Sequence, residues 1–182
     1  ASVIGARMGP EAMRVAGIAQ AIARYGCAVR DCGDVRGPVN PDAPAVAGYR
    51  HLDEVVTWNR AVFAAVHDEL TAGRLPLMMG GDHSLAIGSI SAVARYCRER
   101  SRKLRILWFD AHADFNTSAI TPSGNLHGMP AACLCGFGPP ALVELSGTVP
   151  AIGAGEIRQI GIRSVDEGEK RFLEEQGIEV FD

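Results

Sequence analysis

The stretch LRILWFDAHADFNT, residues 104–117, joins an apolar run to a row of alternating polar side chains. Residues 104–109 have the length and composition of a buried β-strand. Asp110, His112 and Asp114 follow directly at alternate positions, and in an extended segment such side chains point the same way. Because buried carboxylates cost several kcal/mol each unless a cation faces them, the stretch predicts a buried strand whose carboxyl end presents these groups to a positive charge.

Short apolar runs alternate with longer amphipathic ones along the rest of the chain, which is the pattern of an α/β protein. We predict further strands at residues 1–6, 27–34, 75–79, 156–162 and 178–182. Helices are predicted at residues 9–26, 51–72, 85–100 and 166–177. Continuous apolar strands separated by helices indicate one α/β domain, residues 1–182, with three α/β/α layers and a doubly wound, mainly parallel sheet covered on both faces.

Ligand sites in such sheets lie beyond the carboxyl ends of the strands, and two polar segments fall there. GGDHS, residues 80–84, follows one predicted strand and carries His83, while residues 110–114 follow another. Carboxylate and imidazole groups without thiolate suit Mn²⁺, with Fe²⁺, Co²⁺ and Zn²⁺ as competitors. The alternative is a polar strand end with hydrogen-bonded carboxylates, and the second polar segment makes the metal site the stronger interpretation.

A third polar segment, TPSGNLHGMP at residues 121–130, is a loop punctuated by glycine and proline. It carries Ser123, Asn125 and His127 a short way downstream of the expected metal ligands. A lone loop histidine is ordinarily just solvated, but in this place a role as proton shuttle becomes competitive.

The formal net charge of −3 gives no electrostatic basis for binding nucleic acid or an anionic membrane surface. No apolar run approaches the roughly 20 residues needed to span a bilayer, and residues 1–10 lack the pattern of a signal peptide. The chain has five cysteines, an odd number, and together with the lack of a signal-peptide pattern this favours reduced thiols in a cytoplasmic protein. Cys133 and Cys135 could bind a soft metal, but we interpret them as small apolar residues on a helix within residues 129–138.

GGDHS, DAHADFNT and SGNLHGMP, in this order and spacing, resemble the ureohydrolase (arginase–agmatinase) family, and arginase within it. The similarity extends through residues 159–181 and covers residues 8–18, so it spans nearly the whole chain. The resemblance implies an arginase-like fold, assembly into trimers or hexamers, and hydrolysis of L-arginine to L-ornithine and urea by a hydroxide that bridges two Mn²⁺ ions.

The resemblance also implies a role for each matching position. His83, Asp110 and Asp114 would bind one manganese ion, and His112 would bind the other together with Asp110, which bridges the pair. Asp114 would handle the proton of the hydroxide, and His127 would carry protons to the leaving amine or to solvent.

Substrate contacts follow from the same motifs. Asn116, Ser123 and Asn125 resemble the residues that recognise the α-carboxylate, while Asp166 and Glu169 resemble those that meet the α-amino group, directly or through water. Agmatinase or another guanidino-substrate hydrolase is the near alternative. The polar groups at positions 116 and 123–125 favour an amino-acid substrate, because a decarboxylated one would leave them unpaired. A zinc deacetylase is a weaker alternative, since those enzymes lack SGNLHGMP.

Two features depart from the family pattern. No segment of the D-x-D-x-x-D-P type follows, although in the family it completes the ligands of the second ion. The connection of residues 6–8 between the first strand and helix is shorter than usual. We therefore expect residues 1–182 to be an arginase-like domain without the family's C-terminal third, belonging to a longer molecule. The alternative, from a different class, is a non-catalytic metal-binding fragment on the same scaffold.

Overall fold

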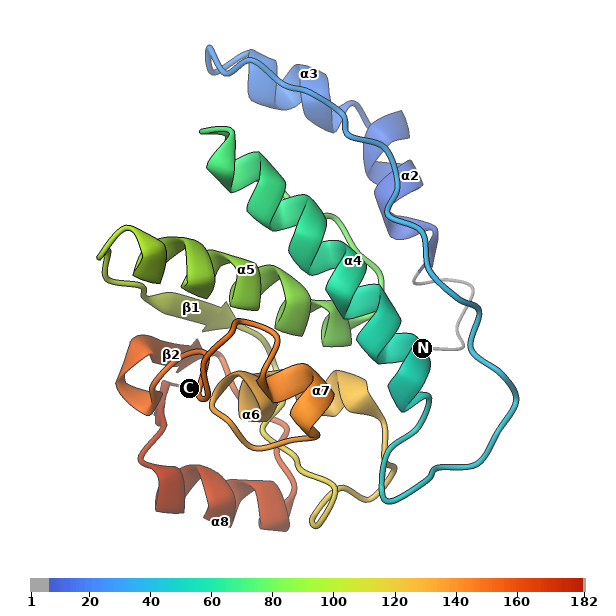
Figure 1. Cartoon of the computed structure of the whole chain (residues 1–182), viewed down its shortest axis with the longest axis vertical. Coiled ribbons are helices and arrows are strands. Elements are labelled where there is room, and N and C mark those ends of the chain that lie inside the picture. Colours follow the sequence, from blue (N-terminus) through green and yellow to red (C-terminus); the bar gives the residue numbers. More distant parts are fainter. Residues whose placement is uncertain (1–6, 182) are drawn as a thin grey trace.

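The computed structural model describes residues 7–181 and contains a three-stranded parallel sheet with helices packed beside it (Figure 1). Its strands lie in the order β1-β2-β3 and are paired in parallel. They span β1 (Ile106–Phe109), β2 (Ile157–Ile160) and β3 (Glu179–Phe181). The α/β class and three of the predicted strands are thereby confirmed. The predicted strand at residues 1–6 lies outside the described residues.

The three longest helices lie where their apolar spacing predicts them. They are α4 (Leu52–Thr71), α5 (Ala86–Glu99) and α8 (Glu167–Gln176). Shorter helices are α2 (Gly9–Val15), α3 (Ile18–Ala23), α6 (Pro130–Leu134) and α7 (Pro140–Val143), and the 3₁₀ turns are η1 (His83–Leu85), η2 (Leu126–Gly128) and η3 (Ala154–Glu156). The single helix predicted at 9–26 is divided into α2 and α3, because Gly17 between them adopts a left-handed conformation with φ of +81°.

Two predicted strands are wrong within the described structure. Residues 27–34 form no strand, and Arg14 of α2 instead pairs with Asp31 and Asp34 of that segment, at 2.9 and 2.7 Å. Residues 75–79 also form no strand, and Leu75 remains 94% exposed. An apolar run becomes a strand only when a neighbouring strand satisfies its backbone groups, and no described residue pairs with either segment as a strand.

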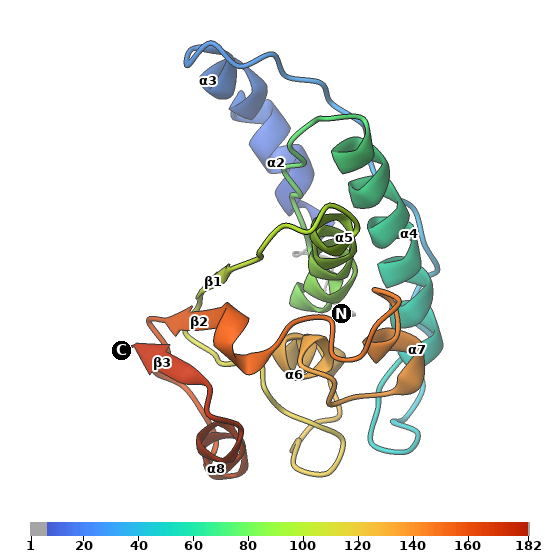
Figure 2. The ribbon, with the colours of Figure 1, turned by 60° about the vertical axis from the view of Figure 1, so that its left-hand side comes forward.

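The main core lies on one face of the sheet. Trp108 of β1 and Ile157 of β2 are buried there against residues of α5, α6 and α8. In Figure 2, α5 lies between α4 and the sheet. Leu107 and Phe109 alternate with Trp108 on β1 and point to the opposite face, where they stay 56% and 71% exposed. The second covering layer that we expect is therefore not formed over β1 by residues 7–181.

Close packing of α4 on α5 places the beginning of α5 beside the sheet. Asn59 of α4 is fully buried, and its Oδ1 accepts a hydrogen bond of 2.6 Å from the backbone N–H of Gly88. A Cβ atom at position 88 would collide with the carbonyl oxygen of Asn59, so only glycine fits at this crossing. η1, which carries His83, leads directly into α5.

The cysteine pair is packed as we predict from its apolar setting. Cys133 lies on α6 and Cys135 directly follows that helix, and both are buried. Burial raises the pKa of each thiol to about 12, so both carry their protons at neutral pH.

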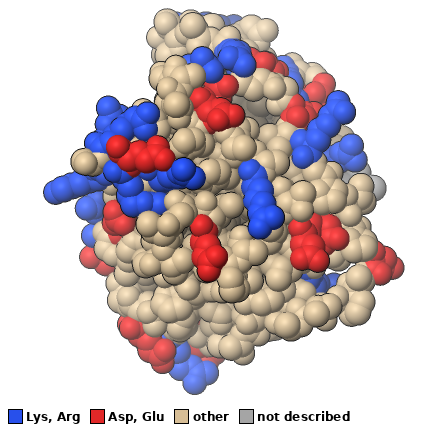
Figure 3. All heavy atoms as spheres, viewed as in Figure 1, with Lys and Arg blue, Asp and Glu red and all other residues tan. Residues whose placement is uncertain are grey.

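Basic side chains gather where α5 ends and the chain turns into β1, on the left of Figure 3. Arginine and lysine predominate in this segment, at positions 95, 98, 100, 102, 103 and 105. Among residues 7–181, no helix combines the length and the apolar character needed to cross a membrane.

Candidate metal centre

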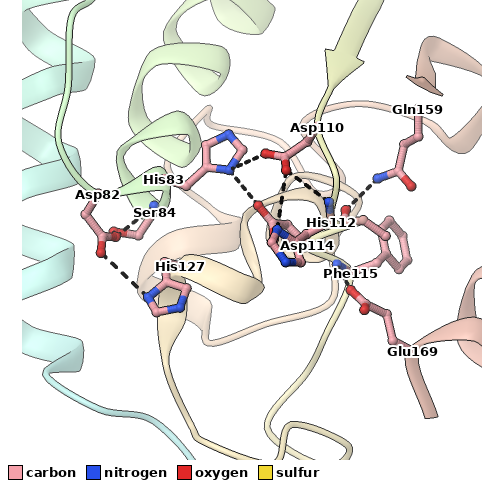
Figure 4. Close-up of polar contacts among 11 residues, drawn as sticks. Asp82, His83, Ser84, Asp110, His112, Asp114, Phe115, His127, Gln159 and Glu169 are labelled. Carbon is pink, nitrogen blue, oxygen red and sulfur yellow. Dashed lines mark hydrogen bonds and ion pairs between the residues drawn. The ribbon is translucent and has the colours of Figure 1, made fainter. Parts of the chain in front are cut away.

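The polar segments singled out in the sequence meet beyond the carboxyl end of β1 (Figure 4). Residues 110–116 leave β1 as an irregular loop, η1 begins α5 on one side, and η2 lies within the loop of residues 121–130. The site therefore lies at the edge of the sheet where the strand pattern predicts a ligand.

Three side chains form the centre of the site. His83 Nδ1 lies 2.6 Å from Asp114 Oδ2 and 3.3 Å from Asp110 Oδ2. One ligand atom from each residue lies within 4.8 Å of the other two. Ligand atoms around one divalent ion have about this spacing, because metal–ligand bonds are about 2.0–2.2 Å long. One imidazole nitrogen and two carboxylate oxygens fit a divalent transition metal such as manganese.

The two carboxylates also make this a strong site for a proton. The hydrogen bond to Asp114 raises the pKa of His83 above its ordinary value, and the negative charges of Asp114 and Asp110 add to this shift. The same arrangement that attracts a proton to this nitrogen favours a divalent cation among the three groups.

Asp110 lies between two imidazoles. Its Oδ2 faces His83, while its Oδ1 lies 3.4 Å from His112 Nδ1 and accepts a hydrogen bond of 2.9 Å from the His112 backbone N–H. The structure does not bring His112 into the three-residue cluster, and its side chain is 62% exposed. One oxygen directed to each histidine is the arrangement that a bridging carboxylate would need.

Trp108 helps to orient His83 and was not singled out from the sequence. The indole of Trp108 is 4% exposed and stacks on the imidazole, with 4.7 Å between the ring centroids. The feature of the sequence that could have revealed Trp108 is its position two residues before the expected ligand Asp110.

Asp82 and His127 form a second pair beside the centre. His127 Nδ1 lies 3.7 Å from Asp82 Oδ2, and Asp82 Oδ1 accepts hydrogen bonds from the backbone N–H and hydroxyl of Ser84, at 3.0 and 2.5 Å. Burial opposes the charged form of Asp82, but the nearby imidazole of His127 and the hydrogen bonds from Ser84 outweigh it and lower the pKa of the carboxyl. The nearby carboxylate of Asp82 in turn raises the pKa of His127. The expected proton shuttle thus has a carboxylate that stabilises its charged form.

Three of the five expected substrate residues lie together. Asn116 Nδ2 donates to Asp166 Oδ2 at 3.1 Å, and Asp166 Oδ1 accepts a hydrogen bond from the backbone N–H of Glu169 at the beginning of α8. Glu169 is only 4% exposed, and its Oε1 accepts a hydrogen bond of 2.7 Å from the Phe115 N–H. Its carboxylate is thus directed at the loop of residues 110–116. Asn116 Oδ1 is buried and finds no hydrogen-bond partner within residues 7–181.

Ser123 and Asn125 lie on the loop before η2. The Ser123 hydroxyl accepts a hydrogen bond of 3.3 Å from the Asn125 N–H, and the Gly124 carbonyl accepts one of 2.8 Å from the Arg50 N–H. The hydrogen bonds of residues 7–181 do not join either side chain to the group of Asn116, Asp166 and Glu169.

The wild type should lose unfolding free energy as pH rises from 4.5 to 7, because Glu169 becomes charged in a buried position. Glu169→Gln should not show this loss. Burial raises the pKa of Glu169 to about 6 from 4.5, so its contribution to stability is complete below pH 4.5 and is lost as pH rises through 6. We expect the difference in unfolding free energy between the variant and the wild type to grow by about 1–2 kcal/mol from pH 4.5 to pH 7. Urea unfolding with a metal chelator at both pH values measures this; parallel changes in the two proteins would contradict it.

A second residue that sequence analysis did not single out is Gln159 of β2. It is fully buried, and its Nε2 donates to the carbonyl oxygen of Ala113, between the expected ligands Asp110 and Asp114, at 2.5 Å. A polar residue within the apolar run of residues 156–162 was the signal that could have revealed it.

Comparisons with known proteins show which family this chain resembles. The model of the arginase family matches residues 2–182. The arginase of Bacillus caldovelox is 41% identical over 181 residues, which are 97% of this chain and 58% of that protein. Its native structure at pH 5.6 has a TM-score of 0.88 to this chain, covering 95% of this chain and 57% of that one. The Entamoeba histolytica arginase in complex with L-ornithine is 31% identical, with a TM-score of 0.84 over 95% of this chain and 57% of its own.

The chain spans less than three fifths of the length of these relatives, and the match includes all of the described site. The family model matches nearly the whole chain, and the similarity to the relatives agrees with it. The chain belongs to the arginase family.

Proposed function

We propose that this chain contributes the metal-binding part of an arginase active site, in which the guanidinium group of L-arginine is hydrolysed to L-ornithine and urea. The observation that carries the proposal is the meeting of His83, Asp110 and Asp114 within 4.8 Å of one another. Membership of the arginase family supports the reaction type, and the Entamoeba histolytica relative crystallised with L-ornithine supports an amino acid as the ligand.

The metal that we propose is manganese, held by His83, Asp110 and Asp114 at one position and by Asp110 with His112 at a second. When bound, a pair of such ions lowers the pKa of a water molecule and so supplies the nucleophile that a charge-delocalised guanidinium carbon requires. Oxygen and nitrogen ligands without thiolate are the support for manganese, with iron, cobalt and zinc as competitors.

The side chains around the cluster have distinct tasks in this proposal. Asp114 accepts the proton of the attacking water through a carboxylate oxygen. His127, whose charged form Asp82 stabilises, donates a proton from its imidazole to the nitrogen of the leaving amine as the C–N bond breaks, so that this nitrogen leaves as a neutral amine. Asp114 belongs to the three-residue cluster and His127 lies beside it (Figure 4), so each can act without a large movement of the backbone.

Substrate recognition is proposed for the five polar residues of the neighbouring loops. Asn116, Ser123 and Asn125 would bind the α-carboxylate, and Asp166 with Glu169 would bind the α-amino group. The buried Oδ1 of Asn116, which has no hydrogen-bond partner among the described residues, supports a polar ligand at this place.

Urea production after loading with Mn²⁺ tests the proposal, with arginine and agmatine as parallel substrates. Faster release of urea from arginine supports an arginase, and faster release from agmatine would replace it by an agmatinase. The control is the chelated protein, which should release none.

A second candidate is a metal-binding unit without catalysis, and the observation that favours it is that His112 lies outside the three-residue cluster of the described residues, with its side chain 62% exposed. Isothermal titration with Mn²⁺ separates the two. Two bound ions with urea release indicate the enzyme, whereas one ion without urea indicates the metal-binding unit.

We further propose a cytoplasmic homo-oligomer, a trimer or hexamer, that acts on a small molecule and binds neither nucleic acid nor membrane. Free cysteines at all five positions, two of them (Cys27 and Cys32) exposed, support a reducing compartment. Light scattering coupled to gel filtration measures the assembly.

His127→Ala should lower urea turnover by about 100-fold while leaving the number of bound manganese ions unchanged. A positioned general acid contributes about 10²–10⁴-fold to a rate, and the His127 side chain faces Asp82 rather than the three-residue cluster. Turnover and metal content measured on the same sample test this, with exposed His112→Ala expected to reduce metal content instead. A collapse of metal content in His127→Ala would show that its role is ligation.

A further inference from the structure

The backbone conformation of Asp114 is uncommon among residues other than glycine. Its φ is +50°, in the left-handed region that side chains other than glycine rarely adopt. Asp114 is also the residue whose carboxylate approaches His83 most closely, at 2.6 Å. Something in the surrounding structure must hold this conformation, since the residue itself does not favour it.

Two buried side chains hold the peptide groups on either side of Asp114. On one side, Gln159 Nε2 donates to the Ala113 carbonyl oxygen at 2.5 Å. On the other, Glu169 Oε1 accepts from the Phe115 N–H at 2.7 Å. Figure 4 shows the two side chains reaching the loop from the side opposite His83. They come from different elements, β2 and α8, so together they tie the loop to the sheet and to a helix.

Gln159 is an unexpected residue for its position. It is fully buried in the central strand, yet its Oε1 has no hydrogen-bond partner among residues 7–181. An apolar side chain would fill the same space without burying an unpaired Oε1 atom. The contact that its other end makes, with the carbonyl of Ala113, is what distinguishes glutamine from leucine or methionine here.

Glu169 shows a similar conflict. It is 4% exposed, and burial raises the pKa of its carboxyl to about 6, so the position does not favour a charged side chain. Its carboxyl oxygen nevertheless satisfies the Phe115 N–H, which lies directly after Asp114 in the loop. A neutral carboxyl or an amide at this position could accept the same bond.

We infer that Gln159 and Glu169 are positioning residues that hold Asp114 in its left-handed conformation and thereby set the affinity of the His83–Asp110–Asp114 cluster for a divalent cation. The inference rests on the proposed metal-binding function. Neither residue touches the cluster itself: each acts through one peptide group of the loop. Side chains that support metal ligands in this way typically change affinity by about 10- to 100-fold when they are removed.

The first test is Mn²⁺ affinity, read from the electron paramagnetic resonance signal of free ion. We expect Gln159→Met, which keeps the length and volume but removes the donor, to raise Kd about 10- to 100-fold. Glu169→Met should do the same, whereas Glu169→Gln keeps the acceptor and should restore Kd to within about threefold of the wild type. Gln176→Met, at the end of α8, is the matched control and should leave Kd unchanged.

The second test needs no metal. In the presence of a chelator, amide hydrogen exchange at Phe115 and Asn116 should be at least about tenfold faster in Gln159→Met and Glu169→Met, relative to amides of α4. A merely structural role would lower the melting temperature and leave both Kd and local exchange as in the wild type.

The outcomes separate this inference from the proposed function. A wild type that binds no Mn²⁺ would refute the metal site, and the exchange rates of Phe115 and Asn116 would then decide whether the two side chains hold the loop. Wild-type binding with unchanged Kd in both methionine variants would overturn the positioning role. Should Gln159→Met fail to fold, the Glu169→Met and Glu169→Gln pair decides by loss and rescue.

Discussion

Asp114→Asn is expected to weaken manganese binding at the three-residue cluster by at least about 1000-fold and to abolish urea release. The substitution preserves shape and removes one of the two carboxylates around His83. A unit charge pair 4 Å apart is worth about 4 kcal/mol at an effective dielectric constant of 20, and each 1.4 kcal/mol corresponds to a factor of ten. A divalent ion loses more interaction energy than a unit charge does, so about 1000-fold is the smallest decrease in affinity that we expect.

Titration with Mn²⁺ and a urea assay on the same preparations measure this effect. Asp68→Asn on the exposed surface of α4 removes an equal charge and should change neither quantity. The pKa of His83 offers a check without metal, because its upward shift comes first from the hydrogen bond to Asp114 and should diminish in the variant. Undiminished manganese affinity in Asp114→Asn would mean that the cation lies elsewhere.

Phe115→Ala is expected to lower the free energy of unfolding by about 3–5 kcal/mol. Phe115 is fully buried and lies in an aromatic cluster, with its ring centroid 5.7 Å from that of Phe172 and 6.2 Å from that of Phe137. Removing the ring leaves a cavity where the loop of residues 110–116, α8 and the segment after α6 meet. A loss of this size is a large part of the 5–15 kcal/mol that stabilises an ordinary domain.

Denaturant unfolding monitored by circular dichroism measures the loss. Phe109→Ala is the matched control, because Phe109 lies on β1 close to the same loop but is 71% exposed, and we expect it to cost less than about 1 kcal/mol. Equal losses in the two variants would mean that the aromatic cluster around Phe115 is not a principal part of the core.

Much of the fold could be read from residue spacing. The apolar periodicity of residues 51–72, 85–100 and 166–177 predicts α4, α5 and α8, and the apolar run before Asp110 predicts β1. Residues 27–34 and 75–79 are also predicted as strands, but neither is a strand in the structure. Strand formation depends on a partner that can lie far away in the chain, so an apolar run alone does not decide it.

The candidate site, too, could be predicted from the sequence only in part. Because side chains alternate along an extended chain, the spacing of Asp110, His112 and Asp114 indicates a cation, and the position of His83 after a glycine pair adds a nitrogen ligand. The structure places His112 at the exposed margin and draws His83, Asp110 and Asp114 together. The left-handed φ of Asp114 bends the loop out of the extended form from which the alternation was predicted.

By itself the sequence determined the α/β class, the chemistry of the candidate ligands and the resemblance to one enzyme family, because these follow from residue type and from spacings of a few positions. Only the tertiary structure decided that Asp82 faces His127 and that Gln159 and Glu169 hold the loop of Asp114. Those last two contacts join residues 46 and 54 positions apart. Such partners are chosen by how a strand and a helix pack, which no local pattern specifies.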